Sequence, residues 1–272
     1  MGDPHYRTFD GRFYDFMGTC TYVFAKRCAV EDVLPDFEVL SQNENRGSLR
    51  VSYVGVVTVK VYGLTITVMR TETGRVRIDY VLWNLPVVLN EGKVVLSQMG
   101  RFAVIQTDFG LTVKYDWEHH LVVSLPASYA GKTCGLCGNF NGNPNDDYST
   151  PLGTQARGVP AFGSSWKVAG LVKDALCTDE CVGGCDRCES NQMKLIEGEL
   201  YCSLIGLVAK GPFSSCNSVV PPQAYLDNCK FDLCMGGGLR TFLCRALETY
   251  TEACQKAGVQ VQDWRALARC RE

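Results

Sequence analysis

Fifteen cysteines in a chain of 272 residues constrain the fold of this protein more than any other feature of its sequence. So many cysteines are typical of oxidising compartments, where disulfides form and persist. The count is odd, so at least one sulfur is a free thiol or is bonded outside this chain. We therefore expect a secreted, extracellular protein and a piece of a larger assembly, and not a self-contained enzyme.

Charge and hydrophobicity exclude further classes of function. The net charge is −2 and no basic cluster is present, which argues against nucleic-acid binding. No run approaches about 18 consecutive apolar residues, so we expect no membrane span in this segment. The N-terminus also lacks the basic start and apolar core of a secretion signal.

The cysteines divide the chain into two parts, because residues 1–176 hold four of them and residues 177–272 hold eleven. In the first part, β-branched and aromatic residues alternate with polar ones, which predicts half-buried strands. The alternating runs are 49–54, 57–61, 64–68, 75–80, 102–105 and 111–115. Turn residues such as Tyr62-Gly63 separate them. The sequence therefore predicts a mainly β fold, with an antiparallel β-sandwich over residues 1–176.

The second part, residues 177–272, has a helical pattern. Pro222–Cys229 predicts a helix opened by proline, and Leu239–Ala257 predicts a longer helix that ends before Gly258. Such short, densely cross-linked helices indicate a small disulfide-rich α-helical module.

The aromatic and histidine residues also give expectations. The tryptophans lie in apolar patterns, and we expect them in the core: Trp83, Trp117, Trp166 and Trp264. The neighbouring His119 and His120 would point to opposite faces of a strand, so they would not bind one metal together. No Ser-His-Asp, Cys-His or paired-carboxylate arrangement stands out, so we expect no catalytic site.

Several motifs in register resemble a von Willebrand factor type D (VWD) domain, and the cysteine-rich part resembles the C8 module that follows it in this family. The VWD motifs are Gly2-Asp3-Pro4-His5-Tyr6, Phe9-Asp10-Gly11, Gly18-Thr19-Cys20, Cys134-Gly135-Leu136-Cys137-Gly138-Asn139 and Phe162-Gly163-Ser164-Ser165-Trp166. The C8 cysteines would be Cys188, Cys202, Cys216, Cys229, Cys234, Cys244, Cys254 and Cys270. The resemblance implies an extracellular structural or adhesive protein, of the kind found in mucus and matrix.

A group of oxygen-bearing side chains predicts a calcium site. Asn139, Asn141, Asn143, Asp146 and Asp147 follow one another closely around a turn glycine, and oxygen ligands in such spacing suit calcium. An Asn/Asp-rich surface turn is the alternative. The resemblance adds Asp10 as a distant ligand and the backbone carbonyl of Asn143 in place of its side chain. The implied role of calcium is to fasten the N-terminal strand to the loop after Cys137.

The Cys134-x-x-Cys137 spacing has two interpretations. A redox pair would need a lowered thiol pKa and a helix after a βαβ unit, whereas the surrounding sequence predicts a strand and an Asn-rich loop. The resemblance instead implies the pairs Cys20–Cys177 and Cys28–Cys134. It leaves Cys137 unpaired or bonded to a cysteine outside this chain. A further pair would join Cys181 and Cys185.

The Asp3-Pro4 bond is chemically labile, because the carboxyl group can attack its own carbonyl and a protonated proline nitrogen leaves readily. Relatives with the same motif undergo an autocatalytic cut, and the resemblance implies Asp3 as the electrophile and His5 as a helper. A rigid strand start, in which proline fixes φ, is the alternative.

The function that follows is a calcium-stabilised, disulfide-bonded structural module in mucus, matrix or cell-surface adhesion. Its expected partners are neighbouring domains of the same protein and homotypic or mucin-like extracellular proteins. Two alternatives stay open: thiol-disulfide exchange through Cys134 and Cys137, and specific binding of an immunoglobulin Fc or an egg-coat glycoprotein.

Overall fold

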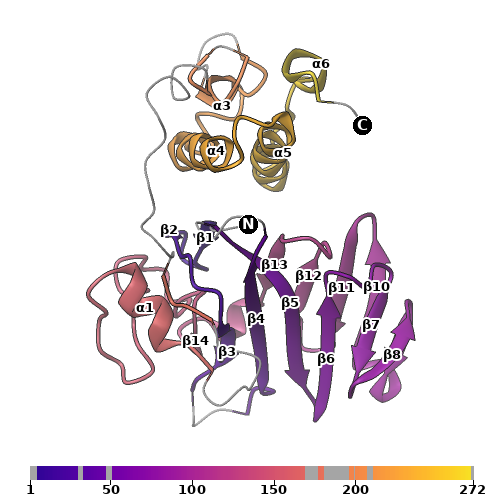
Figure 1. Cartoon of the computed structure of the whole chain (residues 1–272). Coiled ribbons are helices and arrows are strands. Elements are labelled where there is room, and N and C mark those ends of the chain that lie inside the picture. Colours follow the sequence, from indigo (N-terminus) through magenta and orange to yellow (C-terminus); the bar gives the residue numbers. More distant parts are fainter. Residues whose placement is uncertain are drawn as a thin grey trace. The chain divides into compact units, whose positions relative to one another are not determined.

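The computed structural model describes residues 5–29, 33–46, 51–168, 177–180, 196–198, 200–206 and 211–270. Two compact units divide the chain, Met1–Cys185 and Asp186–Glu272, and we call them the β unit and the helical unit. Figure 1 shows that strands build the first unit and that helices α3 to α6 build the second. Each unit is described by itself below.

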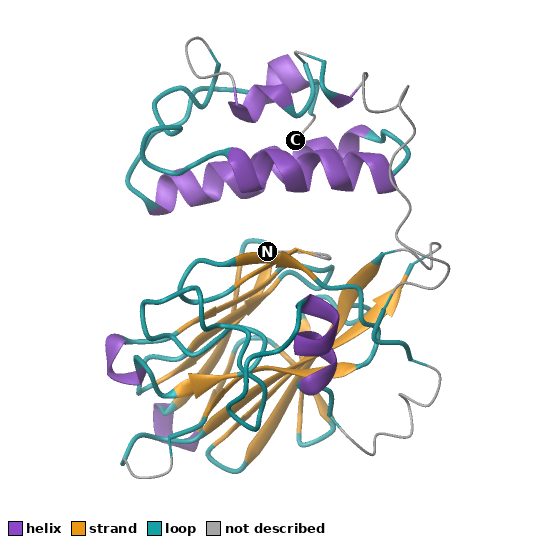
Figure 2. Cartoon of the chain, turned by 90° about the vertical axis from the view of Figure 1, so that its left-hand side faces the viewer, coloured by secondary structure: helices purple, strands orange, loops and turns teal. Residues whose placement is uncertain are grey.

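The β unit consists of antiparallel strands in three sheets (the strands are orange in Figure 2). The seven-stranded sheet has the order β14-β3-β4-β5-β6-β7-β8, the five-stranded sheet has the order β13-β12-β11-β10-β9, and β1 pairs with β2. The strands are β1 (His5–Arg7), β2 (Phe13–Asp15), β3 (Thr21–Arg27), β4 (Phe37–Asn45), β5 (Ser52–Val61), β6 (Leu64–Met69), β7 (Arg75–Ile78), β8 (Val81–Asn84), β9 (Val87–Leu89), β10 (Val94–Met99), β11 (Phe102–Thr107), β12 (Thr112–Tyr115), β13 (Leu121–Ser124) and β14 (Thr133–Cys134). The prediction of a mainly β, antiparallel fold is confirmed.

The two larger sheets enclose one hydrophobic core. Their alternating apolar residues contribute to the same buried cluster, among them Val57 and Ile66 from one sheet and Leu96 and Ile105 from the other. A side-chain hydrogen bond also connects the two sheets, because the Tyr115 hydroxyl donates to the Val54 carbonyl at 2.8 Å. Burial of one face per strand is what the period-two pattern predicted.

Two predicted strands turn out to be one. Residues 49–54 and 57–61 were expected to be separate, but β5 runs without a break from Ser52 to Val61. Gly55 lies at a register shift, where Gln42 pairs with Val56 and Asn43 pairs with Val54. The glycine therefore forms a bulge and not a turn, which is a common use of glycine within a strand.

Two other expectations need correction. Trp83 is not a core residue, because it is 46% exposed on β8, whereas the other three tryptophans are buried. His119 and His120 do not lie on a strand but in the bend between β12 and β13. Asp116 Oδ1 accepts the backbone N–H groups of Glu118, His119 and His120 at 2.7–2.9 Å, and this turn replaces the strand pairing.

Short helices accompany the strands. In the β unit they are α1 (Val159–Ser165) and the 3-10 turns η1 (Asn90–Gly92) and η2 (Ala127–Tyr129). In the helical unit they are α3 (Ser203–Gly206), α4 (Gln223–Met235), α5 (Arg240–Lys256) and α6 (Arg265–Ala268). None of the helices in the described residues is both long enough and apolar enough to cross a bilayer.

The helical unit follows the predicted pattern. Pro222 precedes α4, which continues beyond the predicted end at Cys229 because Leu233 is also buried. Helix α5 buries Leu243, Leu247 and Tyr250 along one face and ends before Gly258, as predicted. Disulfides tie these elements together: Cys202–Cys229, Cys216–Cys254 and Cys244–Cys270, and Cys234 is disulfide-bonded as well. The prediction of a disulfide-rich helical module is confirmed.

Some predictions concern residues outside the described part of the chain. These are the Asp3-Pro4 bond and the cysteines Cys181, Cys185 and Cys188. The predicted boundary after residue 176 does not coincide with the division between the two units. Cys177 is disulfide-bonded to Cys20, and Thr19 N–H donates to the Thr178 carbonyl at 2.7 Å, so residues 177–180 belong to the β unit.

Candidate metal centre

A tight turn after β1 positions Asp10. Gly11 has φ +94°, and Gly11 N–H donates to the Thr8 carbonyl at 3.1 Å. Phe9 N–H donates to the Cys137 carbonyl at 2.8 Å, and the Phe9 and Phe140 rings lie 5.3 Å apart. These contacts hold the turn against the loop that follows Cys137, although more than a hundred residues separate them in the sequence.

Two glycines shape that loop. Gly135 has φ +119°, and a Cβ there would lie 2.8 Å from the Phe24 carbonyl oxygen. Gly138 has φ +79°, and a Cβ there would lie 2.0 Å from Asp147 Oδ1. Only glycine combines this backbone conformation with such close approach. The glycines of the Cys134-Gly135-Leu136-Cys137-Gly138 motif therefore bring the loop against β3 and leave room for the Asp147 carboxylate.

The structure brings five of the predicted side chains into one hydrogen-bonded network. Asp10 Oδ2 and Oδ1 accept the backbone N–H groups of Asn141 and Gly142 at 3.0 and 2.8 Å. Asp146 accepts the side-chain amides of Asn139 and Asn141 at 3.0 and 2.8 Å. Asn139 N–H donates to Asp147 Oδ1 at 3.3 Å.

Asn143 has a different place from the other predicted residues. Its N–H donates to Asn141 Oδ1 at 2.7 Å, and its own Oδ1 accepts the Asn145 N–H at 3.2 Å. The side chain of Asn143 is thus used in the turn, and its backbone carbonyl is the group that the resemblance implies.

Asp147 is the unusual member of the network. It is 0% exposed, and its Oδ2 atom has no hydrogen-bond donor among the described residues. Burial raises the pKa of Asp147, a hydrogen bond with the Thr8 side chain lowers it, and the nearby Asp10 carboxylate raises it, with a net upward shift. Hydrogen bonds from Asn141 and Asn139 instead lower the pKa of Asp146, which is therefore ionised at neutral pH. A buried carboxylate oxygen without a donor is costly unless a cation satisfies it.

The charge of the network points the same way. No Lys or Arg in the described part of the chain forms an ion pair with Asp10, Asp146 or Asp147. Arg12 is near, but its guanidinium donates to the carbonyls of Pro144 and Asn145 and lies over the Tyr148 ring. Three carboxylates and several amide oxygens without a basic partner form the donor set that calcium prefers.

Arg12 is a residue that the sequence reasoning missed. Its two carbonyl contacts, at 3.2 and 3.3 Å, fasten the Asn-rich loop to the turn after β1, and its Cζ lies 3.4 Å from the Tyr148 ring centre. No local signal distinguishes it from other surface arginines, because both partners are more than a hundred residues away.

The cysteines beside the network are fully accounted for among the described residues. The structure contains the pairs Cys20–Cys177 and Cys28–Cys134, which the family resemblance implies. Cys137 is a buried free thiol, and its burial raises its pKa. Cys134 and Cys137 therefore do not form a pair with each other, and Cys137 has the opposite of the lowered pKa that thiol exchange needs.

His5 lies at the start of β1, next in sequence to the labile bond. The residue is 4% exposed, and its Nδ1 lies 2.7 Å from Asp15 Oδ1 on β2, directly across the strand pair. The carboxylate fixes the orientation of the imidazole ring.

A second acidic group lies outside the predicted site. Asp116, Glu118 and His119 place one potential ligand atom each within 4.8 Å of one another. Asp116 Oδ1 is already used by the three backbone N–H groups of its turn, a common function of aspartate. This group is therefore explained by the backbone turn.

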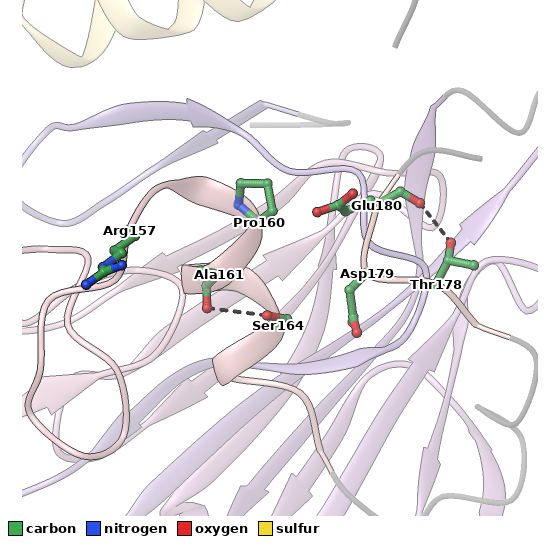
Figure 3. Close-up of a pocket in the computed structure, with 7 residues that line it drawn as sticks. All are labelled: Arg157, Pro160, Ala161, Ser164, Thr178, Asp179 and Glu180. Atoms are coloured by element: carbon green, nitrogen blue, oxygen red, sulfur yellow. Dashed lines mark hydrogen bonds between the residues drawn. The ribbon is translucent and has the colours of Figure 1, made fainter. Parts of the chain in front are cut away.

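A surface hollow of about 730 Å³ lies between α1 and residues 178–180 (Figure 3). Its lining consists of Arg157, Pro160, Ala161, Ser164, Thr178, Asp179 and Glu180. Asp179 accepts the Tyr22 hydroxyl at 2.9 Å and lies 3.4 Å from Lys167 Nζ. None of the residues that line the hollow belongs to the Asp/Asn network, and the Asp179 carboxylate anchors residues 177–180 to β3.

Comparison with known proteins identifies the family. The family model of the von Willebrand factor type D domain matches residues 1–154, and that of the C8 domain matches residues 201–271. The chain belongs to the von Willebrand factor type D family. The resemblance found in the sequence motifs is thereby confirmed.

The relatives of this VWD–C8 chain are much longer proteins. It is 46% identical over 270 residues to the human IgGFc-binding protein, covering 99% of this chain and 5% of that protein. It is 39% identical to human alpha-tectorin and 37% identical to pig zonadhesin, covering 12% and 10% of them and 99% and 97% of this chain. The chain thus spans a small part of each relative. These relatives are multidomain extracellular or secreted proteins, and the chain is a VWD–C8 module of that class.

Proposed function

We propose that this VWD–C8 chain is a calcium-stabilised, disulfide-bonded structural and adhesive module of a secreted multidomain glycoprotein in mucus, matrix or at the cell surface. The observation that carries the proposal is the buried, partnerless Oδ2 atom of Asp147 beside the Asp10 carboxylate. The residues that would hold the ion are Asp10, Asn139, Asn141, Asp146, Asp147 and the backbone carbonyl of Asn143. When bound, calcium supplies positive charge that offsets the mutual repulsion of the carboxylates.

The role we assign to this site is mechanical. Asp10 belongs to the turn after β1, whereas the other ligands belong to the loop after β14. Ligands from two distant segments make the ion a cross-link between them. The Cys28–Cys134 disulfide reinforces the same loop at its other end, where β14 pairs with β3.

The test is a calcium titration of the intact chain by isothermal titration calorimetry, after removal of bound metal with a chelator. We expect one site per chain and a higher melting temperature with calcium than with chelator. A matched titration of Asp10→Asn should show weaker binding, because that variant removes the negative charge of the only ligand on the first segment. No heat of binding and an unchanged melting temperature would contradict the proposal.

We also propose that the module does not catalyse thiol-disulfide exchange. Support comes from the Cys28–Cys134 pair and from the raised pKa of the buried Cys137 thiol. Intact mass after alkylation under denaturing conditions should show one modified thiol at Cys137, or a disulfide from Cys137 to a cysteine outside this chain. Two modified thiols at Cys134 and Cys137 would overturn this proposal and favour exchange.

Self-cleavage at Asp3-Pro4 is a second candidate function, favoured by the contact between His5 and Asp15. In this reaction an oxygen of the Asp3 carboxyl group bonds to the Asp3 carbonyl carbon, the bond from that carbon to the Pro4 nitrogen breaks, and the nitrogen takes a proton. The protonated form of His5 is a suitable donor, with Asp15 orienting its ring. Water then opens the resulting anhydride to two carboxyl groups.

Intact mass over time decides this candidate. Cleavage would release Met1–Asp3, and Pro4→Ala should abolish it because an ordinary amide nitrogen is a poorer leaving group. A stable full-length mass across acidic and neutral pH would contradict it.

The proposed partners are neighbouring domains of the parent protein and homotypic or mucin-like extracellular proteins. The name of one relative states that it binds IgG Fc, so an immunoglobulin Fc is an alternative ligand, as is an egg-coat glycoprotein. Saturable one-to-one binding of Fc to the isolated chain would favour recognition over a purely structural role.

A further inference from the structure

Strand β8 is an edge strand whose apolar side chains are exposed. It is the last strand of the seven-stranded sheet (Figure 1), and all four of its residues are exposed. Val81 is 60% exposed, Leu82 39% and Trp83 46%, and the preceding Tyr80 is 84% exposed. Contiguous exposed apolar residues of this size usually mark an interaction site.

Val81 and Trp83 of β8 lie next to buried core residues of β7 but are not themselves part of the core. In the ladder with β7, Trp83 lies opposite Val76 and Val81 lies opposite Ile78. Val76 and Ile78 are buried, at 1% and 6% exposure. The apolar face of the seven-stranded sheet therefore extends one strand beyond the part that the five-stranded sheet buries.

The edge lacks the usual protection against pairing with another strand. Strand β8 contains no charged residue, no proline and no bulge, which are the devices that commonly block edges. At the other end of the same sheet, β14 has only two residues and is tied by the Cys28–Cys134 disulfide. Strand β8 thus combines an open ladder edge with three consecutive exposed apolar side chains.

The hairpin geometry determines which backbone groups face outward. Asp79 and Tyr80 have φ values of +47° and +71°, which is typical of a two-residue type I′ turn. In such a hairpin the closing pair, Ile78 and Val81, exchanges both ladder hydrogen bonds, and so does every second pair. The N–H and C=O groups of Leu82 and Asn84 therefore point to the open edge.

We propose that β8 is a homotypic contact, in which two copies of this chain pair antiparallel about a two-fold axis through Leu82. Leu82 then exchanges both backbone hydrogen bonds with Leu82 of the second copy, as the outward direction of its groups requires. The flanking pairs are Val81 with Trp83 on the core-facing side, twice by symmetry. Aromatic and β-branched residues directly opposite each other are favourable cross-strand pairs, and here they form a non-hydrogen-bonded pair with closely spaced side chains.

The side-chain pattern of β8 supports a second copy as the occupant, because Val81 and Trp83 meet each other in this register and β8 carries no charged residue. In the two-fold register, Tyr80 of one copy lies opposite Asn84 of the other, and Asn84 is paired with Arg75 on β7. Asp79 accepts the Thr65 N–H on the β6 side at 2.9 Å, so its charge is directed away from the contact. No like charges face each other along β8. A symmetric interface requires such self-complementarity.

This inference rests on the proposed function, because it names the partner of a homotypic adhesive module as a second copy of the chain. A four-residue ladder is a small contact, so a weak association is expected for the isolated chain. Repeated display of the module in a longer protein or on a surface would strengthen it through avidity.

The experiment is sedimentation equilibrium of the whole 272-residue chain over a wide concentration range, with three exposed-site variants. Leu82→Lys and Leu82→Glu each place two like charges directly opposite on the two-fold axis, and we expect each to weaken dimerisation by about tenfold or more. The matched control is Val88→Lys on β9, which is 63% exposed and lies outside the ladder, and it should dimerise as the parent does.

Mixing the two charged variants tests the register. Leu82→Lys and Leu82→Glu should form a heterodimer together, because only a two-fold axis through residue 82 places opposite charges face to face. Amide exchange should show new protection at Leu82 and Asn84 on association. Rescue in the mixture with an unaffected control supports the proposal.

Other outcomes would overturn the proposal. These are a parent chain that stays monomeric at every concentration, a dimer that Leu82→Lys leaves intact, or equal loss in Val88→Lys. None of them bears on the calcium-stabilised module, which the calcium titration decides separately.

Discussion

Replacing Asp147 by asparagine should change the stability of the β unit in opposite directions with and without calcium. The side chain is fully buried, and one of its oxygens has no donor. With calcium the missing charge weakens the site, whereas without calcium the variant no longer has to bury a second negative charge beside Asp10. Asparagine has nearly the same size, so packing stays the same while the negative charge is removed.

The magnitudes follow from two terms. A ligand present at a hundred times its Kd stabilises the folded state by about 2.7 kcal/mol, and each kcal/mol shifts the melting temperature by about 2–4 °C in a domain of this size. The parent should therefore melt about 5–10 °C higher in calcium than in chelator, and Asp147→Asn should lose most of that difference. In chelator the variant should be more stable than the parent by about 1–3 kcal/mol, the cost of a buried unsatisfied group.

Thermal melts followed by circular dichroism measure both effects on the same two samples. Asp108→Asn is the matched control, since the Asp108 carboxylate accepts the Tyr62 hydroxyl at an exposed position and should respond identically in both buffers. A variant that is less stable than the parent in chelator as well as in calcium would refute the reasoning, because it would show that the Asp147 carboxylate is satisfied without a cation.

Further predictions concern the loop glycines, a disulfide and two titrating groups. Gly138→Ala should abolish the calcium-induced rise in melting temperature, because its Cβ would lie 2.0 Å from Asp147 Oδ1, whereas Gly142→Ala, with nothing within 4 Å, should keep it and lose only about 1–2 kcal/mol to backbone strain. Double replacement of Cys28 and Cys134 by serine opens a loop with a sequence separation of 106 and should cost about 2–5 kcal/mol in denaturant unfolding. Burial lowers the pKa of His120, so below about pH 6.5 the unfolded chain binds a proton at this residue that the folded chain does not. The stability of the parent should therefore fall as the pH decreases, and that of His120→Gln should fall less. Burial raises the pKa of Asp147, so in chelator the ionised carboxylate destabilises the folded state at pH values above that raised pKa. As the pH falls below this pKa, the carboxylate takes up a proton and the destabilisation disappears. The stability difference between the parent and Asp147→Asn in chelator should therefore become smaller on acidification.

Local sequence patterns were sufficient for the class of fold and for the family. Alternation of apolar and polar residues depends on which face of a strand each side chain occupies, so it predicts strands wherever one face is buried. Helix α5 could be placed almost to the residue, because a periodic apolar face and a terminal glycine are both local features. The Asp/Asn cluster could be recognised because five of its members lie close together in the sequence.

Tertiary contacts decided the rest. The apolar sequence pattern around Trp83 does not indicate whether the opposite sheet extends far enough to cover this side chain. In the structure the opposite sheet leaves Trp83 exposed. Gly55 looks like a turn residue until the register of β4 and β5 makes it a bulge. The burial of Asp147 depends on Gly138 and on the turn that carries Asp10, and neither dependence is visible in a single segment.

The composition and local motifs of this chain thus determine that it is a disulfide-bonded VWD–C8 module, since cysteine number, strand periodicity and glycine motifs are properties of short segments. The folded structure alone determines which carboxylate oxygen lacks a donor, which thiol is buried and which strand edge stays open. Burial and hydrogen-bond satisfaction depend on surfaces from distant parts of the chain, and these meet only when the sheets pack.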